Sequence, residues 1–320
     1  LFYDYSIDDI DFSSVYDLLR YEMLVGDNTM SKKVKLLQSG TLLTFINKAV
    51  ELKRLFKFVH DSSNQINDEE LLLTEIDKAY ENALLKRCDR PENQIAVFLS
   101  GGMDSRLIIA YANKCFKNKI KAYSFGQNNS EEVDVARKVS EIGGNEFQAI
   151  KLMPKNFIEN SLEYLKRVSG SDFFPQSYII NASKQIAKEN ITSFMTGSFI
   201  ECYMGGTFLL NDALEYEGLF SEYVITHVDS MKCGLFKEEE INNLVSNKQF
   251  FDGKRNNLYN EALKWNDYLV KDAIQAFITD IRDKRLVLNR EIVPSIYLDY
   301  INPNFDKDLL NVLSKIPPEK

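Results

Sequence analysis

The chain has 320 residues, 44% of them hydrophobic, which allows one large or two ordinary domains with a sizeable core. A net charge of −8 argues against a general nucleic-acid-binding protein, and the lack of a long apolar run or signal-peptide pattern argues against a membrane protein. Four scattered cysteines without a Cys-x-x-Cys pair indicate free thiols in a reducing, cytoplasmic compartment, and only two histidines argue against a histidine-rich metal site.

Residues 1–60 differ in pattern from the rest of the chain and predict a β hairpin. Two apolar runs, residues 34–37 and 42–46, flank a turn over 38–41. The polar stretch 61–67 is typical of a linker, and His60 beside it is expected at the surface. The apolar spacing after Asp68 then predicts a helix that runs to Cys88, with Asp68 as its N-cap.

Alternating strands and helices are predicted next along the chain. The expected strands are residues 95–99, 120–125, 146–150 and 193–196, and the helices between them include 154–169 and 177–189. From about residue 208 onward the pattern is helical, with Trp265 on an apolar face and therefore expected in the core. This order predicts the α/β class, with a doubly wound parallel sheet and a helical C-terminal region.

The segment Ser-Gly-Gly-Met-Asp-Ser, residues 100–105, lies between the first of these strands and a helix start. Glycines let the backbone turn sharply, and the free N–H groups of a helix's first turn favour a phosphate. Asp104 would repel that phosphate unless a divalent cation such as Mg²⁺ lay between them. Neither a Walker loop nor a G-x-G-x-x-G pattern occurs here. The alternative is a Gly-rich turn without a ligand.

Further residues at strand ends point to the same place in the fold. Ligands of a doubly wound sheet bind beyond the carboxyl ends of its strands. Ser100, Phe125 and the pair Thr196-Gly197 all fall at such ends. The sequence therefore predicts that they share one site.

Together, these residues resemble the synthetase domain of the asparagine synthetase family, which includes β-lactam synthetase and lasso-peptide cyclases. The resemblance is carried by LSGGMDS (99–105), YSFG with EEVDVARKV (123–139), the Thr-Gly to Gly-Gly loop (196–206) and PNFDKDL with IPP (303–318). It implies that residues 1–60 are the incomplete end of a glutamine amidotransferase-like domain. It also implies that residues 68–320 form an ATP-pyrophosphatase domain of the adenine-nucleotide α-hydrolase-like fold.

The resemblance also assigns site residues and the cofactors ATP and Mg²⁺. By this resemblance the adenosine would be lined by Leu99, Phe125, Thr196 and Gly197. The pyrophosphate and metal would be held by Ser100, Gly101, Gly102, Asp104 and Ser105. Glu201 stands where the family has its second metal-binding acid, so Asp104 and Glu201 are the candidates for metal binding and catalysis.

The loop after Thr196 departs from the family pattern. Ser198 stands where asparagine synthetases carry an acidic residue beside the substrate, and Phe199 and Ile200 replace two small or glycine positions. Cys202 replaces the second acid of an Asp-Glu pair. The departures predict a product other than asparagine.

The resemblance implies an ATP-dependent ligase of carbon–nitrogen bonds that adenylates a carboxylate substrate and releases AMP and pyrophosphate. The nitrogen would come from glutamine-derived ammonia or from an amine; no nucleic acid or membrane partner is expected, and an oligomer is compatible with the sequence. The alternative is a degenerate, non-catalytic member that binds nucleotide or a partner, which pyrophosphate release would distinguish. A relative of NAD or GMP synthetases is disfavoured by the Ile316-Pro317-Pro318 region.

Overall fold

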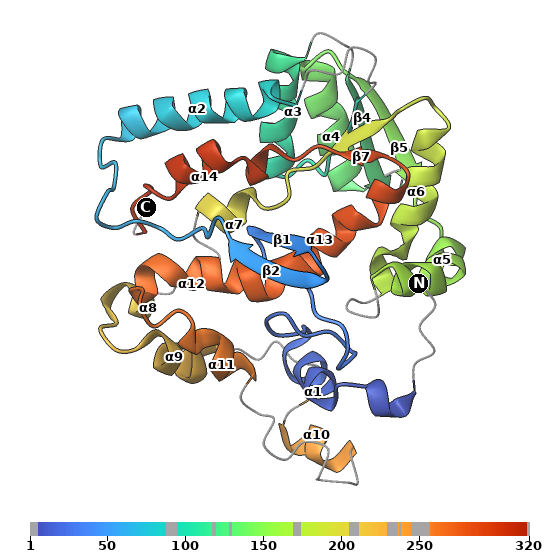
Figure 1. The fold of residues 1–320 in the computed structure, drawn as a ribbon. Helices are drawn as coiled ribbons and strands as arrows, with labels where there is room; N and C mark the ends of the chain where they lie inside the picture. The colour runs from blue at the N-terminus through green and yellow to red at the C-terminus, as the bar shows by residue number, and fades with distance from the viewer. Residues whose placement is uncertain are drawn as a thin grey trace.

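A five-stranded parallel sheet with its helices forms the upper part of the fold as drawn in Figure 1, and a two-stranded β hairpin and a helical region lie below it. The computed structural model describes residues 6–87, 95–116, 120–127, 130–168, 174–204, 211–228, 236, 238–244 and 257–318. The strands are β3 (Ile95–Phe98), β4 (Ile120–Gly126), β5 (Glu146–Lys151), β6 (Ser193–Met195) and β7 (Asp299–Tyr300). Their order is β5-β4-β3-β6-β7, and every neighbouring pair is parallel. The predicted α/β class with a doubly wound sheet is confirmed.

The chain order reverses beside β3, since β4 and β5 lie on one side of this strand and β6 and β7 on the other. The carboxyl ends of β3 and β6 therefore form the switch point at which doubly wound sheets bind ligands. The predicted loop at residues 100–105 follows β3, and Thr196 follows β6.

Helices cover both faces of the sheet because successive side chains of a strand point to opposite sides. In β3, Ile95 and Val97 join a core cluster formed with α2, α3 and α14, whereas Ala96 joins a second cluster formed with α5 and α6. The helices of these layers are α2 (Glu69–Leu85), α3 (Met103–Cys115), α4 (Glu131–Ile142), α5 (Pro154–Arg167), α6 (Tyr178–Ala187) and α14 (Lys307–Leu313). The Asp68 side chain caps α2 as predicted, accepting from the Leu71 N–H at 3.0 Å.

A helical region forms a third core cluster. Its elements are α8 (Asn211–Glu215), α9 (Phe220–Tyr223) with a π-helical turn at Val224–Val228, α11 (Asn257–Leu263), and α12 (Val270–Ile278) with a π-helical turn at Thr279–Asp283. Trp265 is buried there as predicted, against Phe220 and Phe277. Tyr21 of α1 (Phe12–Tyr21) joins the same core. Outside this cluster, α10 (Glu238–Leu244) packs through Ile241 with Tyr16, and α13 (Lys284–Ile292) follows the second π-helical turn. No helix in the described part of the chain has the length and apolarity to cross a membrane.

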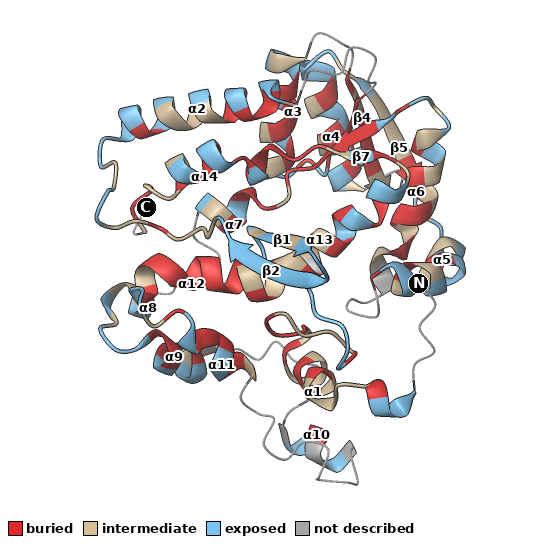
Figure 2. Ribbon diagram, in the orientation of Figure 1, coloured by how far each residue is buried: buried red, intermediate tan, exposed pale blue. Residues whose placement is uncertain are grey.

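The hairpin exists but was placed wrongly from the sequence. Its strands are β1 (Thr41–Ile46) and β2 (Ala49–Arg54), joined at Asn47 and Lys48. Both turn residues have left-handed φ angles, 52° and 66°, and that backbone matches the twist of two antiparallel strands. Both strands are largely exposed (Figure 2). His60 was also misplaced: it is buried, with its N–H donating to the Asp272 carbonyl at 3.0 Å.

Candidate active site

A cavity of about 390 Å³ lies at the carboxyl ends of β3, β4 and β6. The predicted site residues that line it are Ser100, Asp104, Ser105, Phe125, Thr196, Gly197 and Glu201. Residues that the sequence argument did not assign to the site also line it, among them Phe98, Tyr178, Arg290 and Glu291. The cavity thus gathers side chains from the switch point of the sheet and from the distant helix α13.

The loop after β3 has the geometry expected of an anion site. Gly101 has a left-handed φ of 79°, and Gly102 is the N-cap of α3, whose first turn presents unpaired N–H groups. The Ser105 hydroxyl donates to the Gly102 carbonyl at 3.0 Å, and Ser100 Oγ accepts from the Gly102 N–H at 3.3 Å. These bonds hold both serine hydroxyls at the start of the helix, beside a dipole that favours phosphate.

The glycines of the site have different structural roles. A Cβ on Gly101 would lie 2.9 Å from Val135 Cγ1, and a Cβ on Gly197 would lie 2.5 Å from the backbone carbonyl carbon of Asp104. Gly197 therefore lets the loop after β6 pack directly on the first turn of α3. Gly102 has an ordinary φ of −69°, and a Cβ there would meet only Ser100 Oγ, at 3.3 Å.

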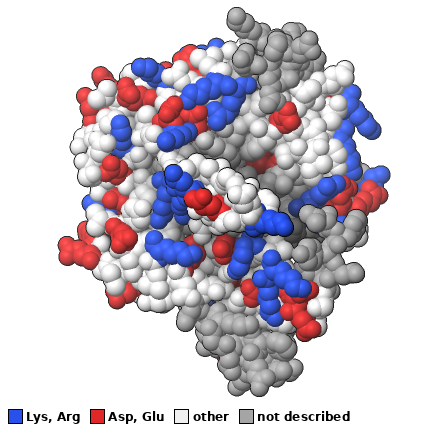
Figure 3. All heavy atoms as spheres, viewed as in Figure 1, with Lys and Arg blue, Asp and Glu red and all other residues white. Residues whose placement is uncertain are grey.

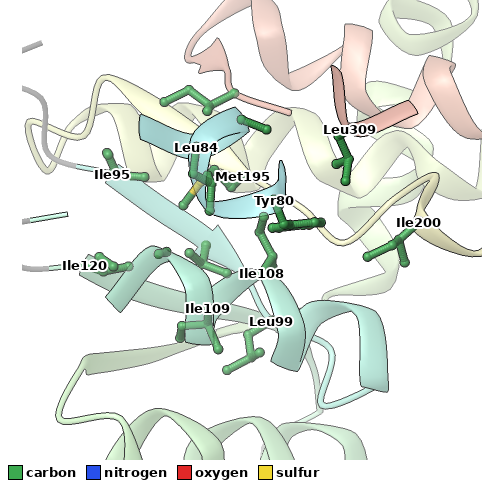
Figure 4. Close-up of a cluster of buried hydrophobic side chains, with 14 of the residues drawn as sticks. Tyr80, Leu84, Ile95, Leu99, Ile108, Ile109, Ile120, Met195, Ile200 and Leu309 are labelled. Carbon is green, nitrogen blue, oxygen red and sulfur yellow. The ribbon is translucent and has the colours of Figure 1, made fainter. Parts of the chain in front are cut away.

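Leu99 does not line the cavity, although the family resemblance assigned it to the adenosine. Its side chain is 1% exposed and packs in the core with Ile108 and Ile109 (Figure 4). Gly101 and Gly102 are likewise absent from the lining. On the apolar side of the cavity, the Phe98 and Phe125 rings lie 5.0 Å apart, and the Phe125 and Tyr178 rings lie 6.0 Å apart. This aromatic surface suits the face of a purine.

Asp104 and Glu201 place two carboxylates on the same cavity. Burial raises the pKa of Asp104, and burial together with the charges of Asp104 and Asp283 raises the pKa of Glu201. Burial disfavours the charge of both acids, and Asp104 further disfavours that of Glu201, so a divalent cation would stabilise the ionised pair. No group of three or more metal-ligating side chains occurs in the described part of the chain. Mg²⁺ is commonly held by one or two carboxylates plus substrate phosphates, so this pair fits it.

Residues 75–198 match the family model described as asparagine synthase. The chain is thus similar to the asparagine synthase family over this segment. The segment contains the strand β3, the Ser/Gly loop at residues 100–105 and the pair Thr196-Gly197. No curated protein sequence matches the chain significantly.

Three enzymes with other names are among the solved structures that are similar to this chain. The NH3-dependent NAD synthetase of Campylobacter jejuni, bound to nitrate, is 11% identical, with a TM-score of 0.33 over 62% of this chain and 96% of that chain. The NMN synthetase of Francisella tularensis is 16% identical, with a TM-score of 0.31 over 58% and 73%. The tRNA thiolase NcsA of Methanococcus maripaludis is 15% identical, with a TM-score of 0.33 over 70% and 79%.

Glu291 lies outside the asparagine synthase segment, yet it forms part of the cavity wall. It is 3% exposed, and its Oε1 accepts from Thr196 Oγ1 at 2.9 Å and from Ser198 Oγ at 2.5 Å. Burial raises the pKa of Glu291 to about 7, although these bonds and Arg290 act in the opposite direction. A carboxyl group that changes charge near neutral pH suits proton transfer. The sequence offered no signal for it, because Glu291 stands in a helix without a motif.

The loop that departs from the asparagine synthase pattern is held in place by the C-terminal motif. Asn304 Nδ2 donates to the Ser198 carbonyl at 2.7 Å, and Asn304 Oδ1 accepts from Tyr80 Oη at 3.0 Å. Phe199 has a left-handed φ of 74°, so a bulky residue occupies a backbone conformation that favours glycine. Cys202 does not line the cavity, and its thiol donates to Asp283 Oδ2 at 3.2 Å. Gly205 and Gly206, which completed the predicted motif, lie outside the described residues.

The buried Glu291 should give the folding stability a distinct pH dependence. Its pKa is raised from 4.5 to about 7, so the folded protein holds the proton more tightly than the unfolded chain. The resulting stabilisation is complete below pH 4.5 and is lost as the pH rises towards 7, about 3 kcal/mol in all. Glu291→Gln, which cannot ionise, should lack this decline in urea unfolding between pH 4.5 and 7. Glu159→Gln, on the exposed face of α5, is the control; parallel pH profiles for Glu291→Gln and wild type would contradict the assignment.

Proposed function

We propose that this protein is an ATP-dependent ligase that forms a carbon–nitrogen bond through an acyl-adenylate. The observation that carries the proposal is the cavity at the switch point of the sheet. The loop at residues 100–105, which we call the phosphate loop and which includes Asp104, meets the acid Glu201 and the aromatic ring of Phe125 there. The asparagine synthase match of residues 75–198 supports an ATP-dependent ligase or synthetase in general.

In the first step, a carboxylate oxygen of the substrate attacks the α-phosphorus of ATP. The bond from that phosphorus to the pyrophosphate oxygen breaks, and pyrophosphate leaves with the electron pair. The first-turn N–H groups of α3 and the hydroxyls of Ser100 and Ser105 hold the pyrophosphate. Asp104 and Glu201 would hold Mg²⁺, which when bound neutralises phosphate charge. Arg290 adds a positive charge to the cavity lining.

In the second step, the nitrogen of ammonia or an amine attacks the acyl carbon, and AMP leaves with the electrons of the broken carbon–oxygen bond. The attacking nitrogen must lose a proton. The ionised form of Glu291 accepts it, since a pKa near 7 leaves a substantial ionised fraction at neutral pH. Thr196 and Ser198 keep this carboxylate oriented through their hydroxyl groups.

AMP release in the presence of different carboxylates tests the proposal. We expect release with one or more bulky carboxylates plus ammonium, but no asparagine from aspartate and ammonium at a useful rate. The reason is that Ser198 is neutral and Phe199 is apolar, so this part of the cavity wall offers no acidic partner to the ammonium group of aspartate. Robust asparagine formation would contradict this selectivity. ATP binding without AMP or pyrophosphate release for any carboxylate would instead favour the alternative of a non-catalytic nucleotide-binding protein.

A further inference from the structure

A second cavity, of about 400 Å³, lies against the first. Its lining comes from the β1–β2 hairpin and the chain just after it, from α12 and α13, and from α14. Phe199 lines both cavities and thus forms a common wall between them. None of the residues that hold the nucleotide in the proposed function lines this second cavity.

Aromatic rings dominate the lining of the second cavity. They belong to Phe56, Phe58, Phe199, Tyr203, Trp265 and Phe305. The Phe199 and Phe305 rings lie 4.9 Å apart, and the Phe58 and Tyr203 rings lie 5.0 Å apart. Such a lining, in a cavity of this volume, suits a small molecule with an apolar or aromatic body.

The lining of the second cavity carries more positive than negative side chains. Asp280 is the acid of the lining, and it already pairs with Arg54 at 3.5 Å and Lys284 at 3.4 Å. The other two cations are Lys57 and Lys307, and no carboxylate in the described ranges lies within ion-pair distance of either. Figure 3 shows basic side chains gathered around the β1–β2 hairpin on this face. An anionic group on the ligand would supply the missing counter-charge.

Lys57 is the cation placed most closely on the aromatic wall. Its Nζ lies 3.4 Å from the centre of the Trp265 ring and 4.3 Å from that of Tyr268. Burial and Arg54 lower the pKa of Lys57 to about 8, against the opposing charges of Asp280, Glu261 and Asp267. An anion bound at Lys57 would stabilise the ammonium in this half-buried place.

We propose that the second cavity binds the acyl substrate of the ligase, a carboxylate with a second anionic group on an aromatic or similarly bulky apolar body. The distal anion would pair with Lys57, while the reacting carboxylate would lie at the Phe199 wall, next to the nucleotide cavity. This substrate class rests on the proposed function, and it explains why the wall between the cavities is apolar: the body of the substrate would lie against Phe199.

Binding can be measured without ATP, because Trp265 is the single tryptophan of the chain. The probe is p-phenylenediacetate, whose two carboxylates flank one ring; p-tolylacetate is the matched monoanion and the diamide of the probe is the neutral match. We expect the dianion to change the Trp265 emission and to bind about tenfold more tightly than the monoanion, with the diamide weakest. Calorimetry supplies the affinities.

Lys57→Met removes the charge but keeps an unbranched apolar side chain. We expect it to weaken binding of the dianion about tenfold and to abolish the preference for the dianion over the monoanion. Lys53→Met, on the exposed strand β2 and outside the cavity lining, should bind all three probes as wild type does. Equal binding of the three probes, no response of Trp265, or unchanged binding by Lys57→Met would overturn the proposal.

ATP–pyrophosphate exchange separates this proposal from the proposed function. Exchange stimulated by small monocarboxylates, with no binding of the dianion at Trp265, would contradict the second cavity alone. Binding of the dianion with the expected dependence on Lys57, but no exchange with any carboxylate, would contradict the ligase reaction and leave only an anion-binding cavity. Support for both requires binding and exchange by the same class of carboxylate.

Discussion

Replacement of Asp104 by Asn should lower ATP–pyrophosphate exchange about a hundredfold while the fold remains intact. Asp104 lies in the first turn of α3 and faces the nucleotide cavity with Glu201. An amide keeps the size of the side chain but cannot balance the charge of a cation against pyrophosphate, and the loss of one such contact costs about 3 kcal/mol in the transition state. Stability should not fall, because burial already disfavours the Asp104 charge by raising its pKa.

The control for this substitution is Asp134→Asn. Asp134 also lies in the first turn of a helix, α4, but it is exposed and lies outside the cavity lining. Exchange by Asp134→Asn should equal that of wild type. Unchanged exchange by Asp104→Asn, with the same urea unfolding curve, would remove Asp104 from the reaction.

Gly197→Ala should damage the fold and the site together. The added Cβ would lie 2.5 Å from the Asp104 carbonyl carbon and 2.7 Å from the Ser105 backbone nitrogen. Backbone atoms cannot move aside as a flexible side chain can, so α3 and the loop after β6 must separate. Overpacking of this kind costs about 1–3 kcal/mol, and the displaced helix start should also weaken ATP binding sharply.

Gly102→Ala provides the matched control for Gly197→Ala. The backbone at Gly102 is ordinary, and its nearest new contact would be 3.3 Å. Urea unfolding of the two variants should therefore differ strongly, whereas ATP titration compares Gly197→Ala with wild type, because Gly102 itself belongs to the loop at residues 100–105. Near wild-type affinity and stability in Gly197→Ala would show that the two loops do not need their close contact.

Local patterns predicted the part of the site that is close together in the sequence. The apolar run 95–99, the Ser/Gly loop and the following helix are consecutive, and their periodicities indicated β3, the turn and α3 correctly. The hairpin was displaced because its turn, Asn47-Lys48, lacks the glycine that usually marks such turns. Residues 34–37 and 38–41 offered a stronger turn pattern, and Gly40 there instead accepts from Leu55 and Phe56 through its carbonyl.

The rest of the site could not be predicted because its residues meet only through the tertiary fold. Strand β7 has two residues and depends on pairing with β6, about a hundred positions earlier. Arg290 and Glu291 reach the cavity from α13, a helix with no chemical motif. Leu99 was assigned by resemblance alone, yet its position at the end of a buried strand places its side chain in the core. The predicted division at residues 1–60 and 68–320 remains a prediction.

The bonds of Asn304 also bear on how this protein assembles. Asn304 joins Tyr80, which lies 224 positions earlier, and the carbonyl of Ser198. Closing a loop of this length carries an entropic cost, which the two hydrogen bonds of Asn304 must offset. During synthesis, a nascent chain that has not yet reached residue 304 carries the phosphate loop but lacks the support for the opposite wall. The wall of the nucleotide cavity that carries Ser198 therefore gains its support only once residue 304 has been made.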